Sequence, residues 1–258
     1  MPKPKVIVVM PAYNAAKTIT KTIGDIPKGL VNEIIVVDDH STDDTVKIAR
    51  KLKLTVYEHP NNLGYGGNQK TCYWEALKRN PDVVIMLHPD YQYDSGLLAD
   101  LVGPIINNKY DFMFGNRIHS RQEALDGGMP KRKYFFNRLF TILANTVLGL
   151  NHPEYLSGLR AYSVKTLKLV PFQRFSNDFA FDQQFMFSAV SFNLRVGSIP
   201  IPTRYYNDSS SIQWWPGVKF GLESLWILAR LFLHQKKVFY CKWFKTSGSS
   251  FTPSSLVK

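Results

Sequence analysis

The sequence predicts an α/β fold with a Rossmann-like, mostly parallel twisted sheet flanked by helices and a helical extension at the C-terminus. Short apolar, β-branched runs alternate with helical stretches through the first half of the chain. That rhythm is typical of a doubly wound parallel sheet. Polar clusters follow several of the apolar runs, and a long, strongly apolar stretch lies near the C-terminal end. These three observations fix the predicted class before any motif is considered.

Two of the predicted strands, residues 6–10 and 33–39, are continuous apolar, β-branched runs, as expected for strands that are covered on both faces. Five strands are predicted in the first half, and a sixth in the second half. They span residues 6–10, 33–39, 54–59, 82–88, 110–115 and 194–201.

Helices are predicted between these strands and beyond them. Residues 41–44 (STDD) are expected to cap a helix that reaches residue 51, because Ser, Thr and Asp favour the first positions of helices. The polar segments 119–133 and 204–212 are predicted to be loops. The predicted helices span residues 14–26, 41–51, 64–79, 95–106, 134–148, 178–192 and 216–234.

The length of 258 residues suits one α/β domain over residues 1–212 with an amphipathic helical extension over 213–245. The Ser-rich segment 246–258 is predicted to be a disordered tail. No apolar run reaches about 18 residues, so no membrane-spanning helix is expected. The apolar stretch around residues 218–233 leaves two alternatives open, a buried core helix or a helix that lies on a membrane surface.

The chain is basic, with 32 Lys and Arg against 20 Asp and Glu and a net charge of +12. Such a charge suits nucleic acid, an anionic membrane or phosphorylated substrates as partners. Nucleic acid is not expected, because no nucleic-acid-binding module is recognisable. Cys72 and Cys241 have no metal or redox spacing, which favours reduced thiols and a cytoplasmic setting. The oligomeric state is not fixed by the sequence.

Acidic side chains stand at the ends of two predicted strands. Asp38 and Asp39 end the second run, and Asp90 follows the fourth. The carboxyl ends of parallel strands meet at one edge, where open α/β sheets bind their ligands. A carboxylate there can bind a ribose or ligate a divalent ion beside a diphosphate. A single Asp in such a place often only forms a turn. Several strand ends that meet at one edge favour a site.

An ordered series of motifs resembles the family 2 glycosyltransferases, which have the GT-A fold. The resemblance covers roughly residues 5–205 and is greatest to the polyprenyl-phosphate glycosyltransferases, which include dolichyl-phosphate mannose synthases. The matching stretches are VIVVMPAYNAA (6–16), EIIVVDDHSTDDT (33–45), NNLGYGGNQKTCYWEAL (61–77), VVIMLHPDYQYD (83–94), FGNRI (114–118) and YLSGLRAYS (155–163).

The resemblance implies roles for individual residues at the predicted edge. Asp90 takes the place of the metal-binding residue in the family's Asp-x-Asp element, so a divalent cation, Mn²⁺ or Mg²⁺, is the implied cofactor. Arg117 is a catalytic candidate that meets phosphate, and Arg138, Arg160 and Arg204 are candidates for phosphate or acceptor contacts. The implied nucleotide-binding residues are Pro11, Tyr13, Asn14, Val37, Asp39, Pro89 and Gln92.

Three departures from the family pattern stand out. His88 replaces the first Asp of Asp-x-Asp, and imidazole suits Mn²⁺ better than Mg²⁺. Ala15 stands where the family has an acidic residue. The Glu of the late helix is replaced within residues 181–184, where Asp182 is the candidate catalytic base.

The resemblance implies inverting transfer of a sugar from a UDP- or GDP-sugar donor. The expected acceptor is polyprenyl phosphate, which would place the protein peripherally on the cytoplasmic face of a membrane. The basic segment 131–133 favours the same acceptor, since it can attract lipid phosphate. Two alternatives stay open: transfer to a saccharide hydroxyl, and a non-catalytic module that binds nucleotide sugars.

Overall fold

The computed structural model describes residues 3–118, 120–202 and 214–244. In this part of the chain one mixed seven-stranded sheet has the order β3-β2-β1-β4-β6-β5-β7. All neighbouring strands are parallel except β6, which runs antiparallel to both β4 and β5. The strands are β1 (Val6–Ala12), β2 (Glu33–Asp38), β3 (Thr55–Glu58), β4 (Val83–Met86), β5 (Phe112–Asn116), β6 (Arg160–Ser163) and β7 (Val196–Pro200).

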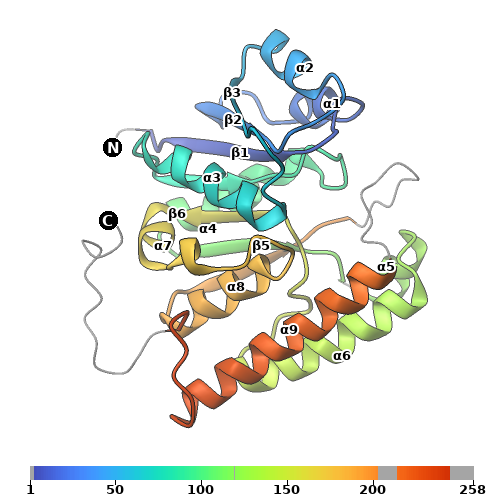
Figure 1. Ribbon diagram of the computed structural model, residues 1–258, viewed down its shortest axis with the longest axis vertical. Helices are drawn as coiled ribbons and strands as arrows, with labels where there is room; N and C mark the ends of the chain where they lie inside the picture. Colours follow the sequence, from blue (N-terminus) through green and yellow to red (C-terminus); the bar gives the residue numbers. More distant parts are fainter. Residues whose placement is uncertain (1–2, 119, 203–213, 245–258) are drawn as a thin grey trace.

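Helices cover both faces of this sheet (Figure 1). Two short 3-10 helices, η1 (Ser95–Leu97) and η2 (Phe172–Arg174), precede α4 and α8. The α-helices are α1 (Ile19–Gly24), α2 (Thr45–Lys51), α3 (Tyr65–Leu77), α4 (Leu98–Ile106), α5 (Arg121–Asp126), α6 (Lys131–Leu148), α7 (Val164–Leu169), α8 (Phe181–Ser191) and α9 (Trp214–Gln235).

The continuous apolar strands are buried on both faces, as their composition predicts. In β1, Ile7 and Val9 pack into the core layer that contains α3 and α8. Val8 and Met10 pack on the opposite side, with α1 and α4. This alternation explains why the runs carry no polar face, and it confirms the predicted α/β fold.

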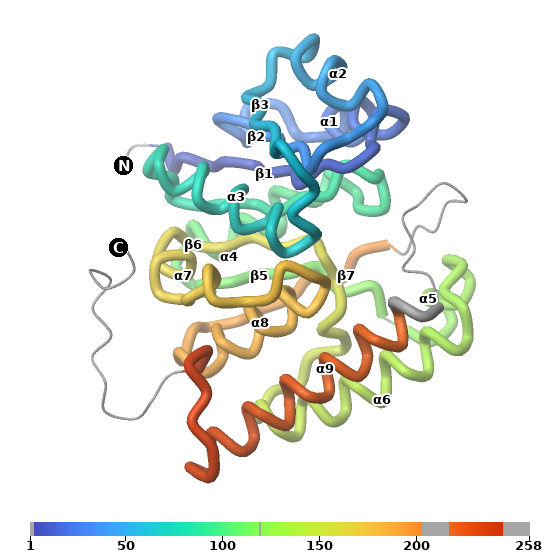
Figure 2. Tube along the Cα trace, viewed as in Figure 1, coloured from blue at the N-terminus to red at the C-terminus, as the bar shows by residue number. Residues whose placement is uncertain are grey.

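Helices α6 and α9 lie side by side at the end of the molecule remote from α2 (Figures 1 and 2). One face of α9 is buried, because Ile227, Leu228 and Leu231 belong to the main core. Its other face is exposed at Leu222 and Trp226. The helix therefore has the buried side of a core helix and the exposed apolar side of an interfacial helix. Placing a domain boundary at residue 213 stays a prediction.

Four local expectations were wrong. Helix α1 begins at Ile19 rather than near residue 14, because Asn14 has a positive φ of 51° and turns the chain. Helix α2 begins at Thr45 rather than residue 41. Segment 119–133 contains α5, whose N-cap Ser120 accepts a bond from the Glu123 amide. Strand β6 was not predicted as a strand, since its four residues begin with Arg and lack an apolar run.

Segments 203–213 and 245–258 lie outside the described residues, and with them Arg204, the predicted loop 204–212 and the predicted tail. Cys72 and Cys241 are both free and buried. Among the described residues, no helix has both the length and the hydropathy needed to cross a bilayer.

Candidate active site

Sharp turns follow three neighbouring parallel strands at their carboxyl ends. Asn14 after β1, His40 after β2 and Tyr91 after β4 all have positive φ angles, of 51°, 68° and 61°. Such angles are uncommon for residues other than Gly, and they cost of order 1–3 kcal/mol where the side chain fits poorly. The strained turns therefore gather at the edge of the sheet where the sequence predicts a ligand.

The acidic pair after β2 is buried and holds the neighbouring loop. The Asp39 carboxylate accepts hydrogen bonds from the amides of Leu63 and Gly64 at 2.8 and 3.0 Å, and contacts His59 Nδ1 at 2.8 Å. One oxygen of Asp38 accepts from the Ser41 amide, whereas its other oxygen is buried without a hydrogen-bond partner. Asp39 thus ties β2 to the entry of α3, and Asp38 keeps one acceptor unused.

The end of β1 presents an exposed aromatic ring beside this acidic pair. Tyr13 is 56% exposed. The Asp39 amide donates to the carbonyl of Ala12, so the ends of β1 and β2 are adjacent. Asn14 accepts from the Thr42 amide and thereby joins the two turns. An exposed ring at this edge of the sheet suits a nucleobase that stacks on it.

Two of the predicted nucleotide contacts lie within the sheet. Pro11 occupies β1, paired with Val37 of β2. Val37 is fully buried, and its carbonyl accepts from Asn68 at 3.0 Å. The Val37 side chain therefore belongs to the core.

A hydrogen-bonded chain connects His88, after β4, with Asp182 at the start of α8. The Tyr65 hydroxyl donates to Asp182 Oδ2 at 2.7 Å and lies 3.1 Å from His88 Nε2. Gln69 donates to the other oxygen of Asp182 at 3.1 Å. Burial lowers the pKa of His88, although Asp90 and Asp182 oppose this shift. Burial and the Asp182 charge raise the pKa of Tyr65, which keeps its hydroxyl protonated.

Arg160, in β6, is fully buried beneath this chain. Its Nη1 donates to the Asp182 carbonyl at 2.9 Å and lies 3.5 Å from the Asp182 carboxylate. Burial alone would lower the Arg160 pKa, but Asp182 and nearby tyrosines raise it above its ordinary value. Arg160 therefore compensates the buried charge of Asp182, which identifies an internal ion pair beneath the edge.

Asp90 lies beside His88, close enough to affect its pKa. The Gln92 amide donates to Asp90 Oδ1 at 3.1 Å, which orients the carboxylate. Pro89 is buried, and its carbonyl accepts from Thr22 of α1. The described residues contain no group of three or more His, Cys, Asp or Glu side chains suited to a metal.

His88 and Asp90 would therefore be the protein's two donors to a divalent ion. Diphosphate oxygens and waters would complete the shell, which is the usual arrangement beside a nucleotide. The donors present are consistent with a Mn²⁺ or Mg²⁺ ion held jointly by protein and substrate.

Two glycines allow the close approaches on which the site depends. A Cβ on Gly158 would lie 2.8 Å from His88 Nε2, and one on Gly66 would lie 2.7 Å from Phe181 Cβ. The amides of Gly66 and Gly67 both donate to the Asn177 carbonyl. Segment 64–67 is therefore a tightly packed helix entry, as expected, and it positions Tyr65.

A second charged cluster follows β5. Arg117 donates from its amide and its guanidinium to Glu154, which is fully buried and also accepts from Asn137 at 2.9 Å. Burial opposes ionisation of Glu154, but Arg117 and these hydrogen bonds together lower its pKa. Arg138 donates to the Pro153 carbonyl. Glu154 thus orders the arginine side chain at this end of the sheet.

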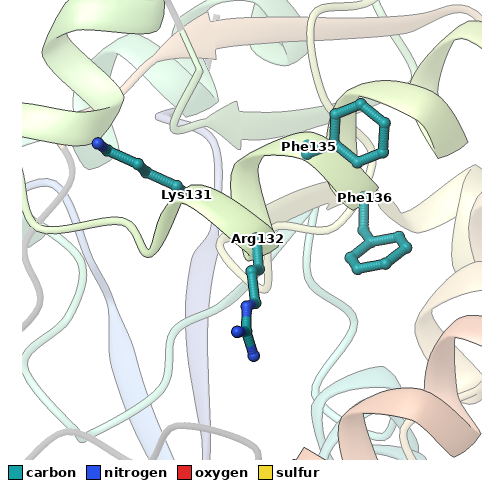
Figure 3. Close-up of a pocket in the computed structure, with 4 residues that line it drawn as sticks. All are labelled: Lys131, Arg132, Phe135 and Phe136. Atoms are coloured by element: carbon teal, nitrogen blue, oxygen red, sulfur yellow. The ribbon is translucent and has the colours of Figure 1, made fainter.

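Lys133 brings further positive charge to Arg117. Burial of its ammonium group and the nearby Arg117 charge lower the Lys133 pKa to about 8. Next to it, Lys131, Arg132, Phe135 and Phe136 line an open groove of about 510 Å³. Figure 3 shows the two rings next to each other, with the Lys131 and Arg132 side chains extending in other directions. The groove therefore combines apolar and cationic lining.

Phe135 and Phe136 of the groove belong to a larger set of exposed apolar side chains, which we call the apolar face. It comprises outward-facing side chains of α6 and α9 and the turn after α9. Its members are Phe135, Phe136, Leu139, Ile142, Leu143, Leu222, Leu225, Trp226, Phe232, Val238, Phe239 and Tyr240. Exposed lysines flank it, namely Lys131, Lys219, Lys236, Lys237 and Lys242.

Several of these residues carried no sequence signal of their own. Tyr65 stands in a glycine-rich segment, and Glu154 follows a His-Pro pair, so only the fold places them beside Asp182 and Arg117. His59, which bridges Asp39 and Thr71, was missed for the same reason. The structure joins His88, Asp182 and Arg160 in one network but puts Arg117 and Arg138 in a separate cluster.

The chain belongs to a known enzyme family, because residues 7–170 match the family model of Glycosyl transferase family 2. It is 30% identical over 209 residues to the uncharacterized protein MJ1222 of Methanocaldococcus jannaschii, covering 81% of this chain and 85% of that one. It is 27% identical over 217 residues to the UDP-N-acetylglucosamine–dolichyl-phosphate N-acetylglucosaminyltransferase of Methanococcus voltae, covering 78% and 86%. The protein is therefore a glycosyltransferase.

A solved structure supports the fold. Glucosyl-3-phosphoglycerate synthase from Mycobacterium tuberculosis, in complex with Mn²⁺, UDP and glucosyl-3-phosphoglycerate, has a TM-score of 0.64 at 21% identity. The match covers 92% of this chain and 81% of that one. The same synthase was also crystallised with Mg²⁺ and UDP. The mixed sheet and flanking helices are thus those of the GT-A fold.

Proposed function

We propose that this glycosyltransferase moves a sugar from a UDP- or GDP-sugar to polyprenyl phosphate at the cytoplasmic face of a membrane. The observation that carries the proposal is that the charged cluster around Arg117 and the apolar face share helix α6. A polyprenyl phosphate has the same two parts, an anionic head and a long apolar chain. The Methanococcus voltae relative, a dolichyl-phosphate N-acetylglucosaminyltransferase by name, supports this acceptor class.

The apolar face has the composition of a membrane-binding surface. Exposed apolar patches of this extent are rare on soluble monomers and mark contacts with membranes or proteins. Phe136 and Trp226 are each 60% exposed on neighbouring helices. Aromatic and aliphatic side chains flanked by lysines match a bilayer interface with anionic headgroups. We therefore propose peripheral binding, with α6 and α9 lying along the membrane surface.

On this proposal, the donor binds at the carboxyl edge of β1, β2 and β4. Tyr13 stacks on the base, and Asp90 and His88 would hold a divalent ion at the diphosphate. When bound, this ion would neutralise charge on the leaving nucleotide. The side chains of the edge orient the donor so that its anomeric carbon faces the acceptor side.

The acceptor phosphate attacks in a single displacement, which inverts the anomeric centre. A phosphate oxygen is anionic at neutral pH, so this attack needs no general base. Arg117, kept extended by Glu154, and Lys133 attract and orient the phosphate. Both carboxylate oxygens of Asp182 already accept hydrogen bonds from Tyr65 and Gln69, which disfavours a role for Asp182 as a base.

The test is sugar transfer to polyprenyl phosphate in vesicles, with a panel of labelled UDP- and GDP-sugars. We expect lipid-linked product with one donor and vesicle binding that weakens with salt. The double variant Phe136→Asp/Trp226→Asp should lose both vesicle binding and the formation of lipid-linked product. Leu52→Asp, a change at the exposed C-cap leucine of α2, serves as the control and should retain both vesicle binding and sugar transfer.

Transfer to soluble saccharides alone, or no loss in the double variant, would contradict the proposal.

A further inference from the structure

The histidine in the metal-binding motif has one ring nitrogen engaged. His88 Nε2 lies 3.1 Å from the Tyr65 hydroxyl. An added Cβ on Gly158 would lie 2.8 Å from Nε2 and 2.9 Å from Cδ2, so this edge of the ring packs against the Gly158 backbone. Nδ1 is on the other side of the ring. No hydrogen bond to Nδ1 occurs within the part of the chain that is described.

The direction of the hydrogen bonds determines which ring nitrogen of His88 carries the proton. A tyrosine hydroxyl has one hydrogen, and Tyr65 donates it to Asp182 Oδ2 at 2.7 Å. The hydroxyl oxygen then accepts from His88, which requires the proton to be on Nε2. In a neutral imidazole the lone pair is then on Nδ1.

Asp182 is itself held in place by other groups. Gln69 donates to its Oδ1 at 3.1 Å, and the Arg160 guanidinium lies 3.5 Å from the same oxygen. The carboxylate is buried, so its acceptor position cannot drift easily. The network of contacts therefore runs from Arg160 and Gln69 to Asp182, and from Asp182 through Tyr65 to His88.

We propose that Asp182 and Tyr65 hold His88 in the Nε2–H tautomer, so that Nδ1 serves as a metal-binding nitrogen beside Asp90 and the site prefers Mn²⁺ to Mg²⁺. Metal-binding histidines commonly donate their other N–H to a carboxylate, carbonyl or water, which fixes the tautomer. Here the hydroxyl of Tyr65 is inserted between the ring and the carboxylate. Mn²⁺ accepts imidazole nitrogen, whereas Mg²⁺ favours oxygen ligands.

This inference rests on the proposed function, because it requires a divalent ion at His88 and Asp90. It assigns Tyr65 and Asp182 as positioning residues rather than catalytic ones. It also gives a chemical reason why His88 stands where the family's Asp-x-Asp element has an aspartate. The prediction is that removal of one hydroxyl changes metal affinity without any change to a ligand.

The tautomer itself is measurable without nucleotide or metal. Long-range ¹H–¹⁵N spectra of the labelled full chain distinguish Nε2–H from Nδ1–H rings, and the signal missing in His88→Asp identifies His88. We expect the Nε2–H pattern in the wild type and a mixture of tautomers in Tyr65→Phe. Tyr57→Phe removes a hydroxyl that bonds to Arg79 instead, and it should leave the His88 signal unchanged.

Metal binding is the second measurement. Electron paramagnetic resonance counts free Mn²⁺ in the presence of UDP, with Mg²⁺ as competitor. Tyr65→Phe should weaken Mn²⁺ binding by about 10- to 100-fold, as is usual for outer-shell partners of a ligating histidine. His88→Asp, which supplies oxygen in place of nitrogen, should lose the preference for Mn²⁺. Tyr57→Phe should bind Mn²⁺ as the wild type does.

An Nδ1–H ring in the wild type would overturn the inference, and so would equal Mn²⁺ affinity in the wild type and Tyr65→Phe. If either of these two outcomes is found and the wild type still binds UDP and Mn²⁺, the proposed function stands. A wild type that binds Mn²⁺ with neither UDP nor GDP refutes the proposed function and this inference together.

Discussion

The packing of segment 64–67 against segment 176–181 yields a quantitative prediction for Gly66→Ala. The added methyl group would lie 2.7 Å from Phe181 Cβ and closer still to the Ser176 carbonyl oxygen. A backbone oxygen and a Cβ cannot rotate away, so one segment must move. That movement breaks the bonds from the Gly66 and Gly67 amides to the Asn177 carbonyl, at 2.8 and 3.3 Å.

The cost follows from these contacts. Two hydrogen bonds contribute a net of about 1 kcal/mol each, and residual overpacking costs about 1–3 kcal/mol. Replacing a helical glycine recovers about 0.5–1 kcal/mol, so we expect Gly66→Ala to lower the free energy of unfolding by about 3 kcal/mol. For a chain of this size the melting temperature should fall by roughly 6–12 °C. Sugar transfer should fall as well, because Tyr65 shifts away from Asp182.

Gly221→Ala in α9 is the matched control, since nothing lies within 4 Å of its added Cβ. Alanine there should raise the free energy of unfolding by about 0.5–1 kcal/mol, because glycine loses more backbone entropy on folding. Urea denaturation and thermal melts of both variants measure the effect. Equal stability of the two alanine variants would refute the packing argument.

Three further predictions concern charged groups. Arg195 holds the Asp111 pKa at about 2, below its ordinary value of 3.8, so Asp111 stabilises the protein by about 2 kcal/mol above pH 4. This contribution to the free energy of unfolding is lost as the pH falls towards 2. In urea titrations, Asp111→Asn should lack both this contribution and its pH dependence. Glu154→Gln removes the buried carboxylate that pairs with Arg117, so the unfolding free energy of this variant should fall by about 3–5 kcal/mol in the same titrations. Affinity for polyprenyl phosphate should fall as pH rises through about 8, where Lys133 loses its charge. Lys133→Arg should remove that pH dependence in vesicle-binding assays, and an unchanged profile would contradict the assigned role.

The strands that the sequence predicts are the ones that are buried on both sides. Val8 and Val36 lie in runs whose residues alternate between two core layers, so composition alone identifies them. The polar ends of these runs lie at one edge of the sheet because parallel strands share a direction. The positions of Asp39 and Asp90 at the site edge thus follow from local pattern plus the handedness rule for parallel sheets.

Residues placed by long-range contacts could not be predicted in this way. β6 is a strand because β4 and β5 flank it, not because of its own four residues. Tyr65 and Asp182 are 117 positions apart and meet only when α3 packs near α8. The exposed side of α6 likewise appears only when its buried side is known, since its apolar residues occupy both sides.

The measurement that tests the central claim most directly is the affinity for UDP in Mn²⁺, by calorimetry, of the wild type, Asp90→Asn and Asp100→Asn. Asp100 is an exposed carboxylate on α4, so Asp100→Asn makes the same chemical change away from the edge. We predict that the wild type and Asp100→Asn bind UDP equally, and that Asp90→Asn loses the Mn²⁺-dependent part of binding. Unchanged Mn²⁺-dependent affinity in Asp90→Asn would contradict a diphosphate site at this edge of the sheet.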